Sequence, residues 1–141
     1  MLSPGATVDR YEVESVLGAG GIAVVYGVRH RTLGTRHALK LLALRHPSIE
    51  ARLVQEGRLQ ARLRHPNIVG VTDTLIIDAT VGLVMEWVDG PSLDAWLIDA
   101  WLAEHGPSTS EIDRLFAGIL AGVAHAHDRG LVHRDLKPAN I

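Results

Sequence analysis

The chain changes character once, at Asp89-Gly90-Pro91, and this change limits the folds that it can adopt. Before the break, short runs rich in Val, Ile and Leu alternate with turn residues, which is typical of β-strands. After the break, apolar residues recur at helical spacing, most clearly from Ile112 to Val123. The sequence therefore predicts an α+β chain with a boundary between its two parts near residues 88–92.

The first part is predicted to form a sheet. Residues 11–17 and 22–29 flank a glycine-rich turn, so we expect them to pair as a hairpin. Further strands are predicted over residues 36–44, 68–71, 74–77 and 81–88. Between these strands, Ser48 is a plausible N-cap of a helix that Pro66 would end. One face of that helix is marked by Leu53, Gly57 and Ala61.

The second part is predicted to contain a long amphipathic helix. Ser108 and Glu111 have the spacing of a capping box, and Gly130 is a plausible C-terminal stop. The apolar stripe from Ile112 to Val123 has few expected neighbours in a chain of this length. We therefore expect an exposed apolar patch on this helix that a protein partner could cover.

A near-perfect tandem repeat precedes the long helix. Residues 93–97 and 98–102 are identical at four of five positions. Five residues advance an α-helix by about 500°, or about 140° out of register, so Trp96 and Trp101 should not face the same core. A short in-frame duplication is the favoured explanation, and an accidental similarity in a half-exposed helix is the alternative.

Composition excludes several classes of function. The formal net charge of −2 argues against a nucleic-acid partner. The chain has no cysteine, hence no disulfide and no thiolate chemistry, which is compatible with the cytoplasm. No apolar run is long enough for a membrane segment, and residues 1–5 lack the pattern of a secretory signal. We expect a cytoplasmic globular protein.

The most specific motif lies at residues 133–140, which read His-Arg-Asp-Leu-Lys-Pro-Ala-Asn. They resemble the catalytic loop of protein kinases. Together with the features upstream, they make residues 11–141 similar to the first half of a protein kinase domain of the bacterial, eukaryotic-like serine/threonine type. This resemblance implies a protein-kinase-like fold. After a lead of residues 1–10, we expect a small lobe (11–88) with an antiparallel five-stranded sheet and one main helix. The hinge exit and a partial helical lobe (89–141) should follow.

The resemblance assigns the chemistry to the catalytic loop. Asp135 would accept or orient the proton of the substrate hydroxyl, Lys137 would steady the γ-phosphate, and Asn140 would hold a magnesium ion. Arg134 resembles the arginine of kinases that are switched on by activation-loop phosphorylation. Pro138 after Lys137 resembles serine/threonine rather than tyrosine specificity.

The resemblance also assigns a loop over the nucleotide. Gly18 and Gly20 would let backbone amides approach the phosphates of ATP. Ala23 replaces the third glycine of the family pattern, and we expect it to stiffen the loop. Leu17 and Val25 would close over the adenine ring.

Two further segments complete the implied ATP site. Ala38 and Lys40 lie on the strand whose lysine would contact the α- and β-phosphates, and Glu56 would hold that lysine. Gln60 stands where the family usually has an apolar residue, so we expect a less rigid helix. The hinge would supply Met85 at the back of the pocket, with the carbonyl of Glu86 and the amide of Val88 as adenine partners. Only two of the 14 Lys and Arg residues are lysines: Lys40 lies in this strand motif and Lys137 in the catalytic-loop motif.

Three hypotheses remain open from the sequence. The chain lacks an Asp-Phe-Gly motif and an activation segment, so as given it is expected to be inactive. It could be an incomplete serine/threonine kinase that phosphorylates protein hydroxyls with ATP and Mg²⁺. It could instead be a catalytically dead nucleotide-binding or regulatory module. A degenerate product that does not fold stably is the third hypothesis.

Overall fold

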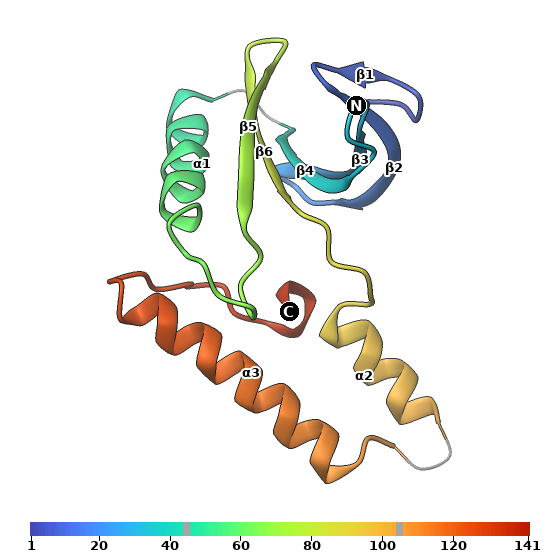
Figure 1. Cartoon of the computed structure of the whole chain (residues 1–141), viewed down its shortest axis with the longest axis vertical. Coiled ribbons are helices and arrows are strands. Elements are labelled where there is room, and N and C mark those ends of the chain that lie inside the picture. Colours follow the sequence, from blue (N-terminus) through green and yellow to red (C-terminus); the bar gives the residue numbers. More distant parts are fainter. Residues whose placement is uncertain (44–45, 104–105) are drawn as a thin grey trace. The chain divides into compact units, whose positions relative to one another are not determined.

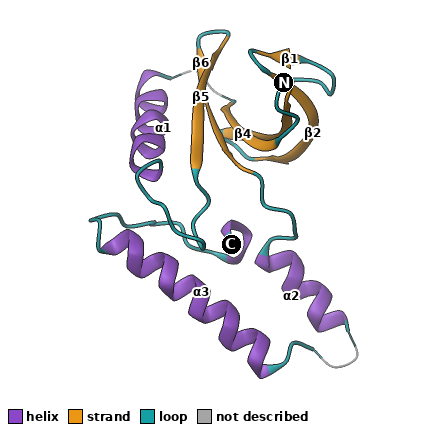
Figure 2. Cartoon of the chain, viewed as in Figure 1, coloured by secondary structure: helices purple, strands orange, loops and turns teal. Residues whose placement is uncertain are grey.

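The computed structural model describes residues 1–43, 46–103 and 106–141. The chain divides into two compact units, one made of Met1–Arg64 and Val69–Trp87 and the other of His65–Ile68 and Val88–Ile141. Strands lie in the first unit and most helical residues in the second, as Figures 1 and 2 show. The α+β content predicted from the change at Asp89-Gly90-Pro91 is confirmed.

The first unit is built on an antiparallel sheet with the strand order β1-β2-β3-β4-β6-β5. Its strands are β1 Thr7–Val8, β2 Tyr11–Ala19, β3 Ala23–His30, β4 Arg36–Leu42, β5 Val71–Ile77 and β6 Thr80–Glu86. The predicted hairpin of residues 11–17 and 22–29 is the β2–β3 pair, and β4 and β6 follow their predicted positions closely. Residue 44, at the end of one predicted strand, lies outside the described residues.

The sheet differs from the prediction at two places. It has six strands rather than five, because Thr7 and Val8 in the predicted lead pair with β2 and bury the Val8 side chain. Residues 68–71 and 74–77 are not two strands, since only Val71 of the first range is extended and it belongs to β5. Asp73 continues the ladder with β6 across an irregularity, so one strand covers both apolar runs.

One face of this sheet carries the larger apolar core. Because successive strand residues point to opposite faces, alternate residues of each strand enter this core. Its buried members are Val8, Tyr11, Val13, Val24, Tyr26, Val28, Leu39, Leu75 and Val84. The chain before β1 packs on the same core through Leu2 and Ala6, and the Leu2 amide donates a hydrogen bond to the Tyr26 hydroxyl over 3.1 Å.

The opposite face packs against α1 (Pro47–Gln60), with Leu42, Leu53 and Leu83 buried between them. Both ends of α1 differ from the prediction. The N-cap is His46 rather than Ser48, because Pro47 takes the first helical position, and the Ser48 hydroxyl bonds the His46 ring over 2.8 Å. The helix ends at Gln60, well before Pro66, in a turn closed by hydrogen bonds to the carbonyls of Gly57 and Leu59.

The second unit contains α2 (Leu93–Leu102), α3 (Thr109–His127) and a 3₁₀ turn, η1 (Pro138–Asn140). The predicted capping box of Ser108 and Glu111 is present, with both reciprocal hydrogen bonds. Gly130 ends the turn after α3 with a φ of 72°, a conformation that favours glycine. The predicted exposed stripe on α3 is also present, since Phe116 is 60% and Leu120 is 63% exposed.

The tandem repeat forms α2 as a single helix. Its two tryptophans differ in exposure as the helical register predicts: Trp96 is half-buried, whereas Trp101 is 76% exposed. The repeat therefore places equivalent residues in different surroundings. Among the described residues, no helix combines the length and apolar composition needed to cross a bilayer.

Candidate active site

The register of β3, β4 and β6 brings several predicted site residues to one face of the sheet. Lys40 is paired with Val25 on one side and with Leu83 on the other, and Ala38 is paired in the same way with Gly27 and Met85. Directly opposed residues of antiparallel strands share a face, and so do residues two apart on one strand. Val25, Ala38, Lys40 and Met85 therefore line the face that also packs against α1.

The predicted phosphate loop is the tip of the β2–β3 hairpin. Gly18 and Ala19 are still paired with Val25 and Val24, and the Gly20 amide donates to the Ala23 carbonyl over 2.9 Å. Leu17 is exposed and lies near Gly27 on the face that carries Lys40.

Contacts within the protein do not explain why this loop has glycines at positions 18, 20 and 21. A Cβ added at Gly18 or Gly21 would meet no atom within 4 Å, and at Gly20 the nearest atom, the Ala23 carbonyl oxygen, would lie at an ordinary 3.6 Å. None of the three has a positive φ. Neither packing nor backbone conformation therefore requires glycine at these three positions.

Lys40 makes the ion pair that the sequence predicts. Its Nζ lies 3.0 Å from Glu56 Oε1 on α1, and the two side chains are 31% and 52% exposed. Glu56 adjoins Gly57, whose close packing on Leu83 fixes α1 against β6. The pair therefore links the middle of the sheet to α1 and leaves the Lys40 side chain partly exposed.

Gln60 has a partner that the sequence did not suggest. Its Nε2 donates to the Val69 carbonyl over 2.8 Å, which ties the last turn of α1 to the chain before β5. Glu86 is held in a similar way, because its carboxylate accepts from the Gly70 amide over 3.0 Å and its own amide donates to the Gly70 carbonyl over 2.9 Å. The expectation that Gln60 makes the helix less rigid stays a prediction.

A cluster at the end of β6 was also missed. Trp87 follows β6 directly, and the Arg36 guanidinium lies 4.2 Å from its ring centroid, while Arg36 is bonded to Glu14. Nothing in the sequence pattern signals this contact, because it depends on the β4–β6 register. Val88, the next predicted hinge residue, belongs to the second unit and is exposed.

The residues of the predicted catalytic loop cluster within the second unit. Lys137 Nζ lies 3.2 Å from Asp135 Oδ2. Asn140 Nδ2 donates to that same oxygen over 3.0 Å and to the Asp135 carbonyl over 2.7 Å. Arg134, just before Asp135, has a φ of 64°, which turns the chain sharply at this point. An acid, an amine and an amide thus share one small region of surface.

The hydrogen bond from Lys137 and then that from Asn140 hold the pKa of Asp135 below its ordinary value of 3.8. Lys137→Met is expected to raise this pKa toward the ordinary value, because it removes both the hydrogen bond and the positive charge. A carboxyl with a lowered pKa contributes its interactions above the ordinary value and loses them as the pH falls through the lowered one. An NMR titration of the Asp135 carboxyl carbon measures the change, and an unaltered pKa would contradict the contact.

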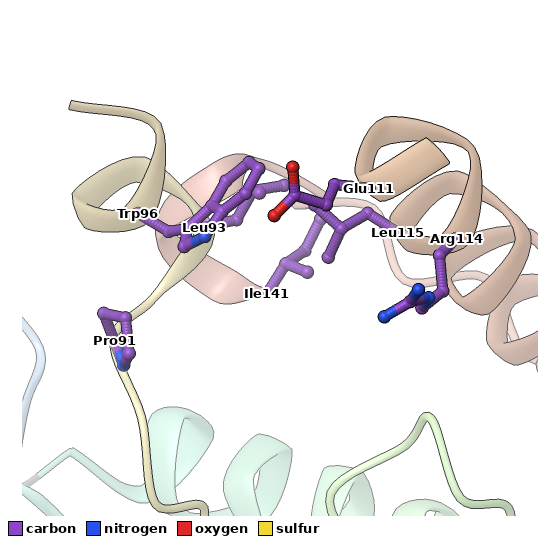
Figure 3. A pocket seen from close by; sticks show the side chains of 7 residues that line it. All are labelled: Pro91, Leu93, Trp96, Glu111, Arg114, Leu115 and Ile141. Atoms are coloured by element: carbon purple, nitrogen blue, oxygen red, sulfur yellow. The ribbon is translucent and has the colours of Figure 1, made fainter. Parts of the chain in front are cut away.

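The second unit also has a hollow of about 340 Å³. Figure 3 shows Trp96 and Leu93 from α2 near Leu115 and Glu111 from α3, with Ile141 close by. The Leu93 amide donates to the Ile141 carbonyl over 2.8 Å and helps to fix this region. The residues that line the hollow include none of the predicted site residues.

Comparison with known proteins agrees with the fold. Residues 11–141 match the family described as protein kinase domain. The chain belongs to the protein kinase family, and the match begins at Tyr11, where β2 starts, and runs to the end of η1 and Ile141.

Its relatives include bacterial serine/threonine kinases. The chain is 34% identical to the serine/threonine-protein kinase PknJ of Mycobacterium tuberculosis, with 99% of this chain and 23% of PknJ covered. It is 38% identical to a probable serine/threonine-protein kinase of Streptomyces coelicolor, with 100% of this chain and 21% of that protein covered. The chain thus spans less than a quarter of the length of either relative.

Solved structures show the same fold. The crystal structure of the Mycobacterium tuberculosis PknI kinase domain matches with a TM-score of 0.80 and 31% identity, over 99% of this chain and 57% of that one. The structure of PpkA-294 in its apo form matches with a TM-score of 0.84 at 21% identity, which supports the fold alone. The predicted protein-kinase-like fold is confirmed, over about half of such a domain.

Proposed function

We propose that the chain is the ATP-binding and catalytic-loop portion of a serine/threonine protein kinase, which transfers a phosphoryl group from ATP to protein Ser or Thr hydroxyls. The observation that carries this proposal is the 3.0 Å ion pair of Lys40 and Glu56 in a chain of this family. A partly exposed lysine fixed by a carboxylate suits a phosphate group, because the carboxylate positions the amine and cannot bind the anion itself.

The first unit would hold most of the nucleotide. The open glycine positions of the β2–β3 tip would face the phosphates, and Lys40 would contact the α- and β-phosphates. The base would lie on the apolar surface of Leu17, Val25, Ala38 and Met85. The Glu86 carbonyl and the Val88 amide would form its hydrogen bonds. The unexplained glycines and the shared face of these side chains support this assignment.

The second unit would carry the chemistry. Lys137 would contact the γ-phosphate, and the Asn140 amide oxygen would bind the Mg²⁺ that accompanies ATP and neutralises developing charge. Asp135 would take the proton of the substrate hydroxyl while the hydroxyl oxygen bonds to the γ-phosphorus and ADP leaves. The lowered pKa of Asp135 keeps the carboxylate ionised near neutral pH, which this role requires.

Residues 1–141 by themselves are proposed to bind nucleotide without turnover. They contain no Asp-Phe-Gly motif, so Asn140 is the only side chain of the family's metal set that they supply. Phosphoryl transfer depends on metal-assisted positioning, and a single amide ligand holds Mg²⁺ weakly. Use of ATP would place the protein in the cytoplasm.

A second candidate function is a regulatory module that binds nucleotide and docks a protein partner. The exposure of Phe116 and Leu120 on α3 favours it, since monomeric proteins rarely leave such apolar stripes uncovered. The two functions are distinguished by fusing residues 1–141 to the part of the PknI kinase domain that this chain does not match. A kinase predicts Mg²⁺-dependent phosphorylation of Ser or Thr that Asp135→Asn abolishes. A dead module predicts nucleotide binding and no phosphorylation by the fusion.

Binding is tested on the 141-residue chain by titrating ATP, with and without Mg²⁺, while following thermal unfolding. A saturable rise in the midpoint is the expected result, because a ligand that binds only the folded state stabilises it. A midpoint that stays constant up to millimolar ATP would contradict the proposal. A chain with no cooperative transition would instead support a product that does not fold stably.

A further inference from the structure

Trp87 is held at the end of β6 by a cross-strand cation–π contact. His37 and Glu86 form the last pair of the β4–β6 ladder, so Arg36 and Trp87 lie one step beyond it on neighbouring strands. The Arg36 guanidinium lies 4.2 Å from the Trp87 ring centroid, well within the range of a cation–π interaction. The side chain that follows the ladder is therefore fixed even though the backbone pairing has ended.

Arg36 is itself fixed by Glu14. The carboxylate of Glu14 accepts from Arg36 Nε over 3.0 Å and from Arg29 Nε over 2.6 Å. Glu14 lies at a register irregularity of β2, between Val13 and Ser15. Burial alone would raise the pKa of Glu14, but the hydrogen bonds from the two arginines outweigh it and lower the pKa. Glu14 is therefore ionised at neutral pH and clamps the arginine that stacks on Trp87.

The Trp87 ring lies beside the face that carries the predicted adenine contacts. A Cβ at Gly27 would lie 2.8 Å from Ser15 Oγ and 3.2 Å from Trp87 Cζ3, so the ring rests where only glycine leaves room. Gly27 is paired with Ala38, and Ala38 is paired with Met85. The ring thus lies on the face that carries Ala38, Lys40 and Met85, next to the row of residues that would contact the base.

We propose that Glu14, Arg36 and Trp87 form a positioning cluster that holds the backbone on both sides of Trp87 in the conformation that binds the adenine base. This inference rests on the proposed function and adds a residue set to it. The cluster sets the affinity for the base, through the Glu86 carbonyl and the Val88 amide that flank Trp87. It does not set the affinity for the phosphates, which depends on Lys40.

The test compares ATP with inorganic tripolyphosphate, both with Mg²⁺, as competitors of a fluorescent ATP analogue on the full chain. Arg36→Ala and Trp87→Ala are each expected to weaken ATP binding about two- to fivefold, the range of an exposed cation–π contact. Neither should change the affinity for tripolyphosphate. Trp87→Phe keeps an aromatic face and should retain most of the affinity. The double variant Arg36→Ala/Trp87→Ala should bind ATP no more weakly than the worse single variant.

Arg10→Ala is the matched control. Arg10 also pairs with a carboxylate, Asp73, and lies near an aromatic ring, that of Tyr11, and these contacts do not involve Trp87. This variant should bind both competitors as the wild type does. Arg36→Lys keeps the charge but not the planar group that stacks on the ring, so it should lower the affinity for ATP by less than Arg36→Ala does. It also serves as a folded variant should Arg36→Ala lose its thermal transition.

Three outcomes would overturn the inference. Equal losses for ATP and tripolyphosphate would mean that Arg36 acts on the phosphates or on the whole fold. Wild-type ATP affinity in both Arg36 variants, with Lys40→Met still weakening the binding of both competitors, would contradict the role of the cluster and leave the proposed function intact. Failure of the wild-type chain to bind either competitor would overturn the proposed function and this inference with it.

Discussion

Lys40→Met is expected to remove most of the stabilisation of the chain by ATP. The ammonium of Lys40 is held 3.0 Å from Glu56, and the Lys40 side chain is 31% exposed, so an anion can approach it. Methionine keeps the length and most of the volume of the side chain but has no charge. A hydrogen bond between a charged donor and its partner contributes about 1.5–3 kcal/mol, so the Kd for ATP should rise by about tenfold or more. Calorimetric titration and the ATP-dependent shift in thermal midpoint measure this loss.

Two controls make the result specific. Arg58→Met removes an exposed cation from α1, the helix that carries Glu56, and should leave ATP binding unchanged. Glu56→Gln keeps Lys40 but weakens its support, so it should give a smaller loss than Lys40→Met. An ATP-dependent shift in Lys40→Met equal to that of the wild type would show that the nucleotide, if bound, is not bound at this lysine.

Leu83→Ala is expected to lower the free energy of unfolding by about 2–5 kcal/mol. Leu83 is 0% exposed and packs with Leu53 and Leu42 between β6 and α1. A loss of that size is a large fraction of the total stability of a small domain. Because α1 carries Glu56, the same change should also weaken ATP binding. Urea denaturation followed by circular dichroism measures the stability, and Ile76→Ala serves as control, since Ile76 is 79% exposed on β5.

A second change at Gly57 tests whether this packing is the cause. A Cβ at Gly57 would lie 2.6 Å from Leu83 Cδ2, so Gly57→Ala alone should destabilise the chain. In the Leu83→Ala background the same methyl group enters the space that leucine has left, and alanine favours a helix over glycine by about 1 kcal/mol. The double variant should therefore be more stable than Leu83→Ala alone. A double variant that is less stable than Leu83→Ala would contradict the described contact between α1 and β6.

The parts of this fold that the sequence predicts are those with a periodic or strongly local signal. The β2–β3 hairpin follows from its glycine-rich turn, and the capping box of Ser108 and Glu111 follows from two residues three apart. The strand β1 has no such signal, because two residues cannot show a period. The N-cap at His46 was missed because Pro47, rather than a capping side chain, sets where α1 begins.

The candidate site also has some features that the sequence predicts and others that it does not. Lys40 and Glu56 could be named from their motifs, and the structure places them 3.0 Å apart. The bond of Gln60 to the Val69 carbonyl and the stacking of Arg36 on Trp87 could not be named. Both depend on where the end of one element lies against another, and that is decided by tertiary packing and strand register rather than by neighbouring residues.

The most direct measurement of the central claim uses the chain's two lysines, Lys40 and Lys137. The proposed function requires that both amines contact the phosphates of one ATP molecule. An acyl phosphate of ATP transfers its acyl group to an amine beside the bound phosphates, and mass spectrometry of the digested chain identifies the acylated lysines. Acylation of both lysines, with ATP in excess protecting both, is the result that we predict. Acylation that ATP does not reduce, or that is absent from either lysine, would contradict the account.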